Sequence, residues 1–337
     1  MLGEGSNTTK TPVVCKLTEQ VFATSRDESG NPAVFSAALR RRIKAYGMRE
    51  LNESSSVGRQ PCLYLSIIRH PVFHGDVFVN GSILYCGDTD LSGAAAYLAG
   101  LMTAWKWSFD YIASNERIRM QQLEQPRALL ILSDYPAAQF DSDCQQAALR
   151  MIEAGCGLLM IGGWESFHGF GGDWDGTQLA AALPVEIESR DDRMNFDQSA
   201  WLVPAGAHPI TTGLPWLKRP PAIGGMNRVR PKPAAATVLE AHSFEVSNSG
   251  MTHPPESQQS AWTFSPDRRY PALVVSQFGS GRTAAFLSDV APHWVGGFVD
   301  WGLPRVSGQA AHGQAIEVGH DYGLFWKQLL EWTSNGL

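Results

Sequence analysis

One stretch of about eighty residues alternates short apolar runs with segments of helical periodicity, and this alternation constrains the fold more than any other feature. The runs at 82–88, 127–134 and 157–163 have the length and the Gly or Asp flanks of buried strands. Segments 92–107 and 142–155 have the length and the apolar spacing of helices. A strand, helix, strand order that repeats twice predicts βαβ units around a mainly parallel sheet.

Four further features complete the prediction of secondary structure. Ser142 is expected as the N-cap of the helix that it begins. Beyond residue 183 the sequence is less regular, and we expect long loops with short strands among them. Order returns at 270–289, where two apolar runs flank a Phe-Gly-Ser-Gly-Arg turn and predict a β-hairpin. The apolar spacing of 322–333 predicts a closing helix.

The first sixty residues differ from the rest of the chain. Residues 1–12 are polar, 33–48 have the pattern of an amphipathic helix, and 49–61 have the composition of a linker. We therefore divide the chain into an N-terminal extension with a linker, residues 1–60, and one α/β domain, residues 61–337. A globular domain that begins near residue 61 would look complete, so the sequence does not establish Met1 as the natural start.

Composition limits where the protein works and what it binds. The chain is 44% hydrophobic and 18% charged, and no apolar run approaches the roughly 18 residues that span a bilayer. The first residues, MLGEGSNTTK, lack the basic and apolar parts of a secretory signal, so a cytoplasmic location and no membrane partner are expected. Five cysteines without a CxxC pair indicate free thiols in a reducing compartment.

Charge patterning argues against a nucleic-acid partner. The net charge is −6, and the one basic cluster, at residues 40–44, lies inside the predicted N-terminal helix without a stripe of aromatic residues. A solvated helix face explains that cluster better than a nucleic-acid contact. A small-molecule ligand is the expected partner.

Polar residues follow the predicted strands, and in open α/β sheets ligands bind beyond the carboxyl ends of the strands. If the strands are parallel, these residues share one rim and could supply acid and base groups. The candidate catalytic residues are His293, His168, Glu165, Ser166, Asp289 and Cys86. The candidate ligand-binding residues are Asp88, Asp134, Trp164, Trp294, Gly162 and Gly163.

Each candidate also has a structural interpretation. An Asp at a strand end often caps the next helix, a His in a glycine-rich loop often bonds backbone, and Trp164 and Trp294 could cover the core. The phosphate fingerprints GxGxxG and GxxxxGK[ST] are both missing, so no cofactor is expected. A metal site from Asp88, Asp134, His168 and His293 is an alternative, but no ligand spacing fixes it and we assign no metal.

Six segments of the sequence resemble the glutamine amidotransferase-like family of the class I glutamine amidotransferase-like superfamily, which is related to the ThuA-like proteins. The resemblance covers about residues 82–333 and implies a flavodoxin-like, three-layer α/β/α fold with a mainly parallel sheet. It is carried, in this order, by LLILSDYP, GCGLLMIGGWESFHGFGG, TQLAAALPVEIESRDDR, HPITTGLPW, GGMNRVRPKP and GSGRTAAFLSDVAPHW.

The resemblance also says where a nucleophile would stand. Working amidotransferases of this class place a Cys on a sharp turn between a strand and a helix, in a G-x-C-x-G setting, backed by a His and a Glu. That position falls on Trp164 here, so glutamine hydrolysis through a thioester is not expected. Cys86 is an alternative nucleophile, as is Ser166 with His168 or His293.

Three hypotheses of function follow from these residues. The first is a protein that binds a small polar metabolite, a sugar or an amino-acid derivative, at the rim. The second is a hydrolase or lyase for a carbon–nitrogen or glycosidic bond, with His293 or His168 as base and a carboxyl group as acid. The third is an interaction module that forms a homo-oligomer through the helix at 33–48 or the loops after residue 183.

Overall fold

The structure is a computed structural model that describes residues 82–248 and 262–336. These residues all belong to one compact unit, His74–Leu337. The extension and linker predicted over 1–60, including the helix at 33–48, lie outside the described residues.

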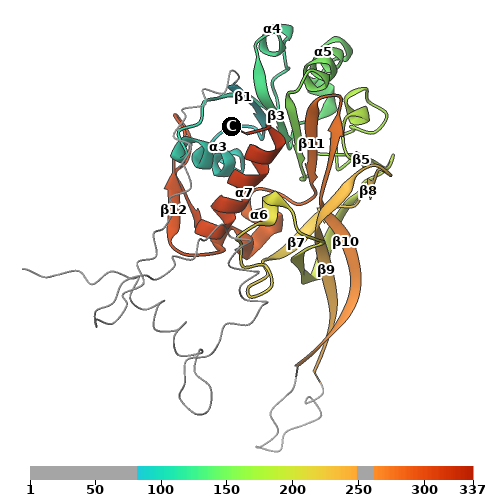
Figure 1. The fold of residues 1–337 in the computed structure, drawn as a ribbon, viewed down its shortest axis with the longest axis vertical. Coiled ribbons are helices and arrows are strands. Elements are labelled where there is room, and N and C mark those ends of the chain that lie inside the picture. The colour runs from blue at the N-terminus through green and yellow to red at the C-terminus, as the bar shows by residue number, and fades with distance from the viewer. Residues whose placement is uncertain (1–81, 249–261, 337) are drawn as a thin grey trace, which may run out of the picture. The chain divides into compact units, whose positions relative to one another are not determined.

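Nine strands of the described residues form one mixed sheet in the order β2-β1-β3-β4-β11-β10-β9-β6-β7 (Figure 1). The parallel half comprises β1 (Ser82–Gly87), β2 (Phe109–Ala113), β3 (Arg127–Ser133), β4 (Gly157–Ile161) and β11 (Gly281–Phe286). The antiparallel half comprises β6 (Arg193–Pro204), β7 (Ala222–Asn227), β9 (Ala236–Asn248) and β10 (Trp262–Phe278).

Helices cover both faces of the parallel half, which makes the fold three-layered. The connection from β1 leads to β2, toward one edge of the sheet, and the connection from β3 leads to β4, toward the opposite edge. Because both crossovers are right-handed, the two connecting helices lie on opposite faces of the sheet. None of the helices in the described segments is long and apolar enough to cross a membrane. The longer helices are α3 (Ala95–Ala104), α5 (Ser142–Glu153) and α7 (His320–Thr333).

Shorter elements complete the described chain. The short helices are α4 (Met120–Leu123), α6 (Pro292–Val295), η1 (Ala137–Gln139), η2 (Leu179–Ala181), η3 (Pro209–Thr211) and η4 (Gly296–Asp300). Two small antiparallel pairs are β5 (Val185–Glu186) with β8 (Arg230–Pro231), and β12 (Arg305–Gly308) with β13 (Ile316–Gly319).

The α/β, flavodoxin-like class expected from the sequence is confirmed. Strands β1, β3 and β4 are buried on both faces, and therefore their sequences are continuous apolar runs. The predicted hairpin is also present, with Phe278 opposite Gly281 across its turn. The predicted helices at 92–107, 142–155 and 322–333 correspond to α3, α5 and α7.

Two local predictions need correction. Strand β2 was not predicted, because it is a short edge strand whose first three residues are partly or fully exposed and so lacks a continuous apolar run. The N-cap of α5 is Asp141 rather than Ser142, since the Asp141 carboxylate accepts a hydrogen bond from the backbone N–H of Cys144. Asp at this position satisfies a free helix N–H as well as Ser would.

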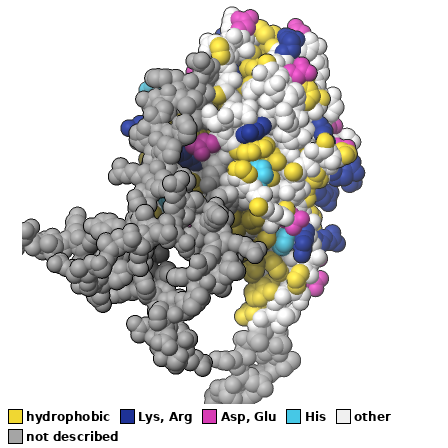
Figure 2. Space-filling view, viewed as in Figure 1, with side chains coloured by type: hydrophobic (Ala, Val, Ile, Leu, Met, Phe, Trp, Pro, Cys, Tyr) yellow, Lys and Arg dark blue, Asp and Glu magenta, His cyan; other side chains and the backbone are white. Residues whose placement is uncertain are grey.

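The prediction of long loops with short strands after residue 183 is right for residues 205–221, where the only regular element is the short helix η3, and wrong for the strands. Strands β6, β9 and β10 are long and antiparallel, and β9 and β10 form an arm (Figure 1). Hydrophobic side chains gather along the lower part of this arm (Figure 2), and Trp262 and Phe264 are exposed on it. Because much of the arm is not covered by helices, its residues are mixed in polarity and do not form the apolar runs that mark a buried strand.

Candidate functional site

The strand order reverses between β1 and β3, and a carboxyl group follows each of these strands. The chain leaves β1 toward the edge strand β2 and leaves β3 toward β4. Asp88 comes directly after β1, and Asp134 directly after β3. In open α/β sheets this reversal is where ligands bind, beyond the carboxyl ends of the strands.

A cavity of about 710 Å³ opens at this place, and we call it the acidic crevice. It contains four carboxyl side chains and no Lys or Arg among its described lining residues. The lining residues are Asp88, Thr89, Ala94, Asp134, Trp164, Glu165, Phe170, Asn195, Asp289, His293 and Trp294. The ends of β1, β3, β4 and β11 therefore bring predicted rim residues from distant parts of the sequence into one cavity.

Asp134 is held in an uncommon backbone conformation. Its φ of 49° lies in the left-handed region, which costs free energy for a residue with a side chain. Its backbone N–H donates to Ser166 Oγ at 2.9 Å, and its Oδ1 accepts from the backbone N–H of Glu165 at 2.8 Å. A Cβ on Gly163 would lie 2.2 Å from both carboxylate oxygens. Gly163 is therefore required for the carboxyl group of Asp134 to occupy this position.

Asp289 and His293 form a second polar pair in the crevice. Asp289 is buried, and its Oδ1 accepts from the backbone N–H groups of Val290 at 2.6 Å and Ala291 at 3.0 Å. Its Oδ2 lies 3.9 Å from His293 Nδ1, and the His293 side chain is 78% exposed. An anchored carboxyl group thus faces an accessible imidazole.

The carboxyl groups do not titrate independently. Burial, and then the charge of Asp289, raise the pKa of Asp134 above its usual range. Burial also raises the pKa of Asp289, against the lowering effect of its hydrogen bonds from Ala291 and Val290. Burial, and then Asp88, raise the pKa of Glu165. A carboxyl group that keeps its proton at higher pH can act as a general acid.

An aromatic wall borders the crevice. The residues Trp164 and Phe170 are 59% and 69% exposed, and the Arg193 guanidinium carbon lies 4.3 Å and 5.0 Å from the centroids of their rings. Asp191 fixes this guanidinium through two hydrogen bonds of 2.9 Å and 2.7 Å. The cation is already paired with a carboxylate, so it holds the wall in place without adding a free positive charge.

A buried hydrogen-bond network holds the loop after β4. Asn227, at the end of β7, accepts from the backbone N–H of Gly163 at 2.9 Å and donates to Asp192 Oδ1 at 2.8 Å. The carboxylate of Asp192 also accepts from the backbone N–H groups of His168 and Gly169, both at 3.1 Å. These side chains fix the loop that carries Trp164.

Neither Asp192 nor Asn227 was predicted from the sequence as a site residue. Asp192 and Asn227 lie in two of the segments that carried the resemblance, and this was the signal that could have found them.

Most residues of this site lie in a part of the chain that matches the model of a known family. The family model described as "Putative glutamine amidotransferase" matches residues 125–306, more than half of the 337-residue chain. The chain belongs to this family. The matched span of the amidotransferase-like chain includes Asp134, the loop after β4, the Asp192–Asn227 network and the Asp289–His293 pair.

Two solved structures with TM-scores above 0.5 share the fold, and a third is similar at a lower TM-score. Cytoplasmic protein STM1381 from Salmonella typhimurium LT2 is 21% identical with a TM-score of 0.57, over 75% of this chain and 99% of that one. Cytoplasmic protein STM3548 from Salmonella typhimurium is 19% identical with a TM-score of 0.54, over 75% and 98%. A ThuA-like protein from Parabacteroides merdae is 13% identical with a TM-score of 0.44, over 75% and 89%. No curated protein matches significantly.

Five of the twelve candidates do not line the acidic crevice of this amidotransferase-like protein, and for Cys86 this corrects the prediction of an alternative nucleophile. Cys86 is fully buried within the core, and burial raises the pKa of its thiol, so it is not an accessible nucleophile. Ser166 is also buried, and its hydroxyl accepts the hydrogen bond from Asp134. Gly162 and Gly163 pack tightly against neighbouring atoms, which leaves no room for a Cβ at either position.

His168 also lies away from the crevice. Its Nδ1 is 2.6 Å from Asp175 Oδ1, and this hydrogen bond, opposed by burial, raises the pKa of the imidazole. It is therefore not positioned as a base beside Asp134 or Asp289. The metal alternative that used His168 loses a ligand, and no group of three or more His, Cys, Asp or Glu in the described segments is arranged to hold a metal ion.

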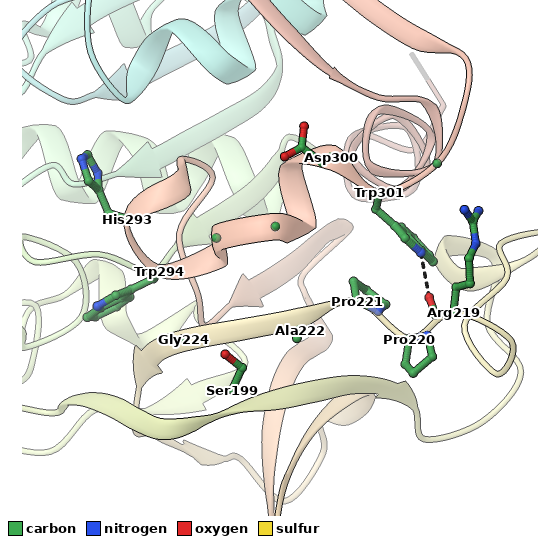
Figure 3. A pocket seen from close by; sticks show the side chains of 13 residues that line it. Ser199, Arg219, Pro220, Pro221, Ala222, Gly224, His293, Trp294, Asp300 and Trp301 are labelled. Carbon is green, nitrogen blue, oxygen red and sulfur yellow. Dashed lines mark hydrogen bonds between the residues drawn. The ribbon is translucent and has the colours of Figure 1, made fainter.

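A second cavity, of about 470 Å³, adjoins the first, and we call it the β7 cavity (Figure 3). The two cavities share His293 and Trp294 and no other described lining residue. The β7 cavity is lined by Ser199, Arg219, Pro220, Pro221, Ala222, Gly224, His293, Trp294, Gly296, Gly297, Asp300, Trp301 and Gly302.

Proposed function

We propose that this protein binds a small polar metabolite, a sugar or an amino-acid derivative, in the acidic crevice, and that it does so without thioester glutaminase chemistry. One observation carries the proposal: four carboxyl groups and two tryptophans meet in one cavity of about 710 Å³ at the reversal of strand order. Two observations argue against a thioester intermediate: the expected nucleophile position holds Trp164 instead of a Cys, and Cys86 is buried.

The lining indicates what kind of ligand fits. Carboxylates accept hydrogen bonds, and the described lining contains no Lys or Arg to bind an anion. The ligand therefore presents donors, either hydroxyl groups or an ammonium group. The exposed ring of Trp164 and the ring of Trp294 can contact the C–H groups of a sugar ring or of an aliphatic segment.

A hydrolase or lyase is the second candidate, because one specific pair favours it. His293 is exposed beside the anchored carboxylate of Asp289, and Asp134 holds its proton at raised pH. His293 would act as base and Asp134 as acid on a carbon–nitrogen or glycosidic bond. His293→Ala should then abolish turnover without loss of stability, and unchanged turnover would dismiss the assignment.

The cellular setting is part of the proposal. We place the protein in the cytoplasm, as the names of the two Salmonella proteins state for them, with a small molecule as its partner and neither nucleic acid nor membrane. A homo-oligomer through the antiparallel arm is the alternative, supported by the exposed rings of Trp262 and Phe264. Light scattering on the full chain distinguishes a monomer from an oligomer.

Binding is tested by calorimetry with a panel of monosaccharides, amino sugars and amino acids. We expect at least one compound to bind, and the double variant Asp134→Asn, Asp289→Asn to bind it about tenfold or more weakly. The amide of Asn cannot ionise to pair with an ammonium group, and it has one acceptor oxygen where a carboxyl group has two. Trp164→Ala should weaken it less. Asp197→Asn and Trp262→Ala change an exposed carboxylate and an exposed indole outside the crevice, and serve as matched controls. Equal effects of crevice and control variants would refute the site.

A further inference from the structure

The β7 cavity continues the acidic crevice past His293 and Trp294. Figure 3 shows these two side chains at one end of the cavity, Trp301 and Arg219 at the other, and β7 running between them. A ligand that fills the acidic crevice therefore has a second space of about 470 Å³ next to it.

The chemistry of the second space differs from that of the first. Its two charged residues are already paired: Arg219 with Asp321 at 2.8 Å, and Asp300 with Arg305 at 2.6 Å. The indole N–H of Trp301 donates to the carbonyl oxygen of Arg219 at 2.7 Å, as Figure 3 shows. Most of the remaining surface is proline, alanine, glycine and indole. It suits a neutral group, because a charged one would lose hydration without gaining a partner.

His293 and Trp294 line both cavities, and we call this pair the ridge; its position is fixed by packing. Trp294 is buried, and a Cβ on Gly225 would lie 2.6 Å from two atoms of its indole ring. The ring therefore packs directly on the backbone of β7. His293 precedes it and is exposed to both cavities.

We propose that the β7 cavity is a second subsite of the acidic crevice, which receives a neutral ring or chain joined to the polar head of the ligand. The ligand is then a conjugate of two parts, and its linking bond crosses the ridge at His293. This inference rests on the proposed function, since it assigns the polar head to the acidic crevice.

The test compares polar heads with the same heads extended by a phenyl group. The probes are glucosamine with its phenyl β-glycoside, and ethanolamine with 2-phenoxyethylamine. Calorimetry on the full chain should show that at least one phenyl compound binds about tenfold tighter than its head, because the ring leaves water to contact the side chains of Pro220, Pro221 and Trp301.

Two variants should remove this gain. Gly297 has open space around its Cα and no left-handed φ, so Gly297→Phe can fill the cavity without strain. Ser199→Trp does the same from an exposed position on β6. Both variants should bind glucosamine and ethanolamine with wild-type affinity, but the phenyl group should not increase the affinity of either compound for them. Gly206→Phe is the matched control, because Gly206 has equal freedom and lines none of the described cavities near the crevice.

Each outcome decides between the two proposals. A head that binds without any gain from the phenyl group overturns the subsite and leaves the proposed function standing. A gain that persists in both Gly297→Phe and Ser199→Trp also overturns it. If the double variant Asp134→Asn, Asp289→Asn binds the phenyl compounds as tightly as the wild type does, these compounds bind at a site independent of the acidic crevice. That result would also overturn the subsite. If no head and no extended compound binds, both proposals fail.

Discussion

The parallel and antiparallel halves of the sheet contribute different things to one site. The loops after parallel strands supply all four carboxyl groups of the acidic crevice: Asp88, Asp134, Glu165 and Asp289. The antiparallel half supplies neutral or paired groups, among them Asn195 on the crevice wall and Asn227 beneath the loop after β4. One half thus provides reactive groups and the other holds them in position.

The loop after β4 is not positioned by its own strand alone. Hydrogen bonds from β7 and from the segment before β6 reach it through Asn227 and Asp192. Strand β7 lies at the far edge of the nine-stranded sheet, so the tertiary fold brings a support for the crevice from an element remote in strand order.

The largest effect is expected from Asn227→Ala. The change removes the acceptor for the backbone N–H of Gly163 and a donor to the buried carboxylate of Asp192. Leaving such groups unpaired costs about 2–4 kcal/mol of unfolding free energy. Urea denaturation measures the loss, and Asn195→Ala, on an exposed amide, is the control. A loss as small as that of the control would show that the antiparallel half does not support the loop.

The two halves also differ in how far their sequences predict them. Strands β1, β3 and β4 were predictable, because helices on both faces require continuous apolar runs. Strands β6 and β9 were not, since their exposed residues break such runs. The same reasoning found Asp88, Asp134 and Asp289, which follow predictable strands.

The site was predictable only where strand ends determine it. Sequence position alone could not show that Ser166 turns inward to Asp134, or that His168 pairs with Asp175 away from the crevice. It could not reveal Asn227 either, because the partners of this side chain, Gly163 and Asp192, come from segments distant in the sequence. Such contacts depend on tertiary packing, which short-range patterns do not encode.

An intermediate effect, of opposite sign, is expected from Asp134→Asn. The raised pKa means that the folded protein binds this proton more tightly than the unfolded chain. Stability contributed by Asp134 is therefore complete below the usual carboxyl pKa and is lost as pH rises through the raised value. Asn stays neutral and can still accept the hydrogen bond from the N–H of Glu165.

Asp134→Asn should therefore stabilise the protein by about 1 kcal/mol above the raised pKa and by less in acid. Thermal or urea unfolding at pH 5 and pH 9 measures the difference. Asp197→Asn, on β6, should shift neither curve appreciably, because its carboxyl group is exposed. A stabilisation that does not grow with pH would mean that the parallel half does not concentrate negative charge at the crevice.

The last prediction is that a diazo-ketone analogue of glutamine does not alkylate the buried cysteines of the folded protein. Such a reagent alkylates an accessible thiolate, whereas Cys86, Cys144 and Cys156 are buried and burial raises the pKa of all three thiols. Intact mass and peptide mapping should find none of these residues modified in folded protein, and all of them reactive with a general thiol reagent after denaturation. A single adduct on Cys86 would restore amidotransferase chemistry. It would also mean that the parallel half opens in solution far enough to expose a residue of its core.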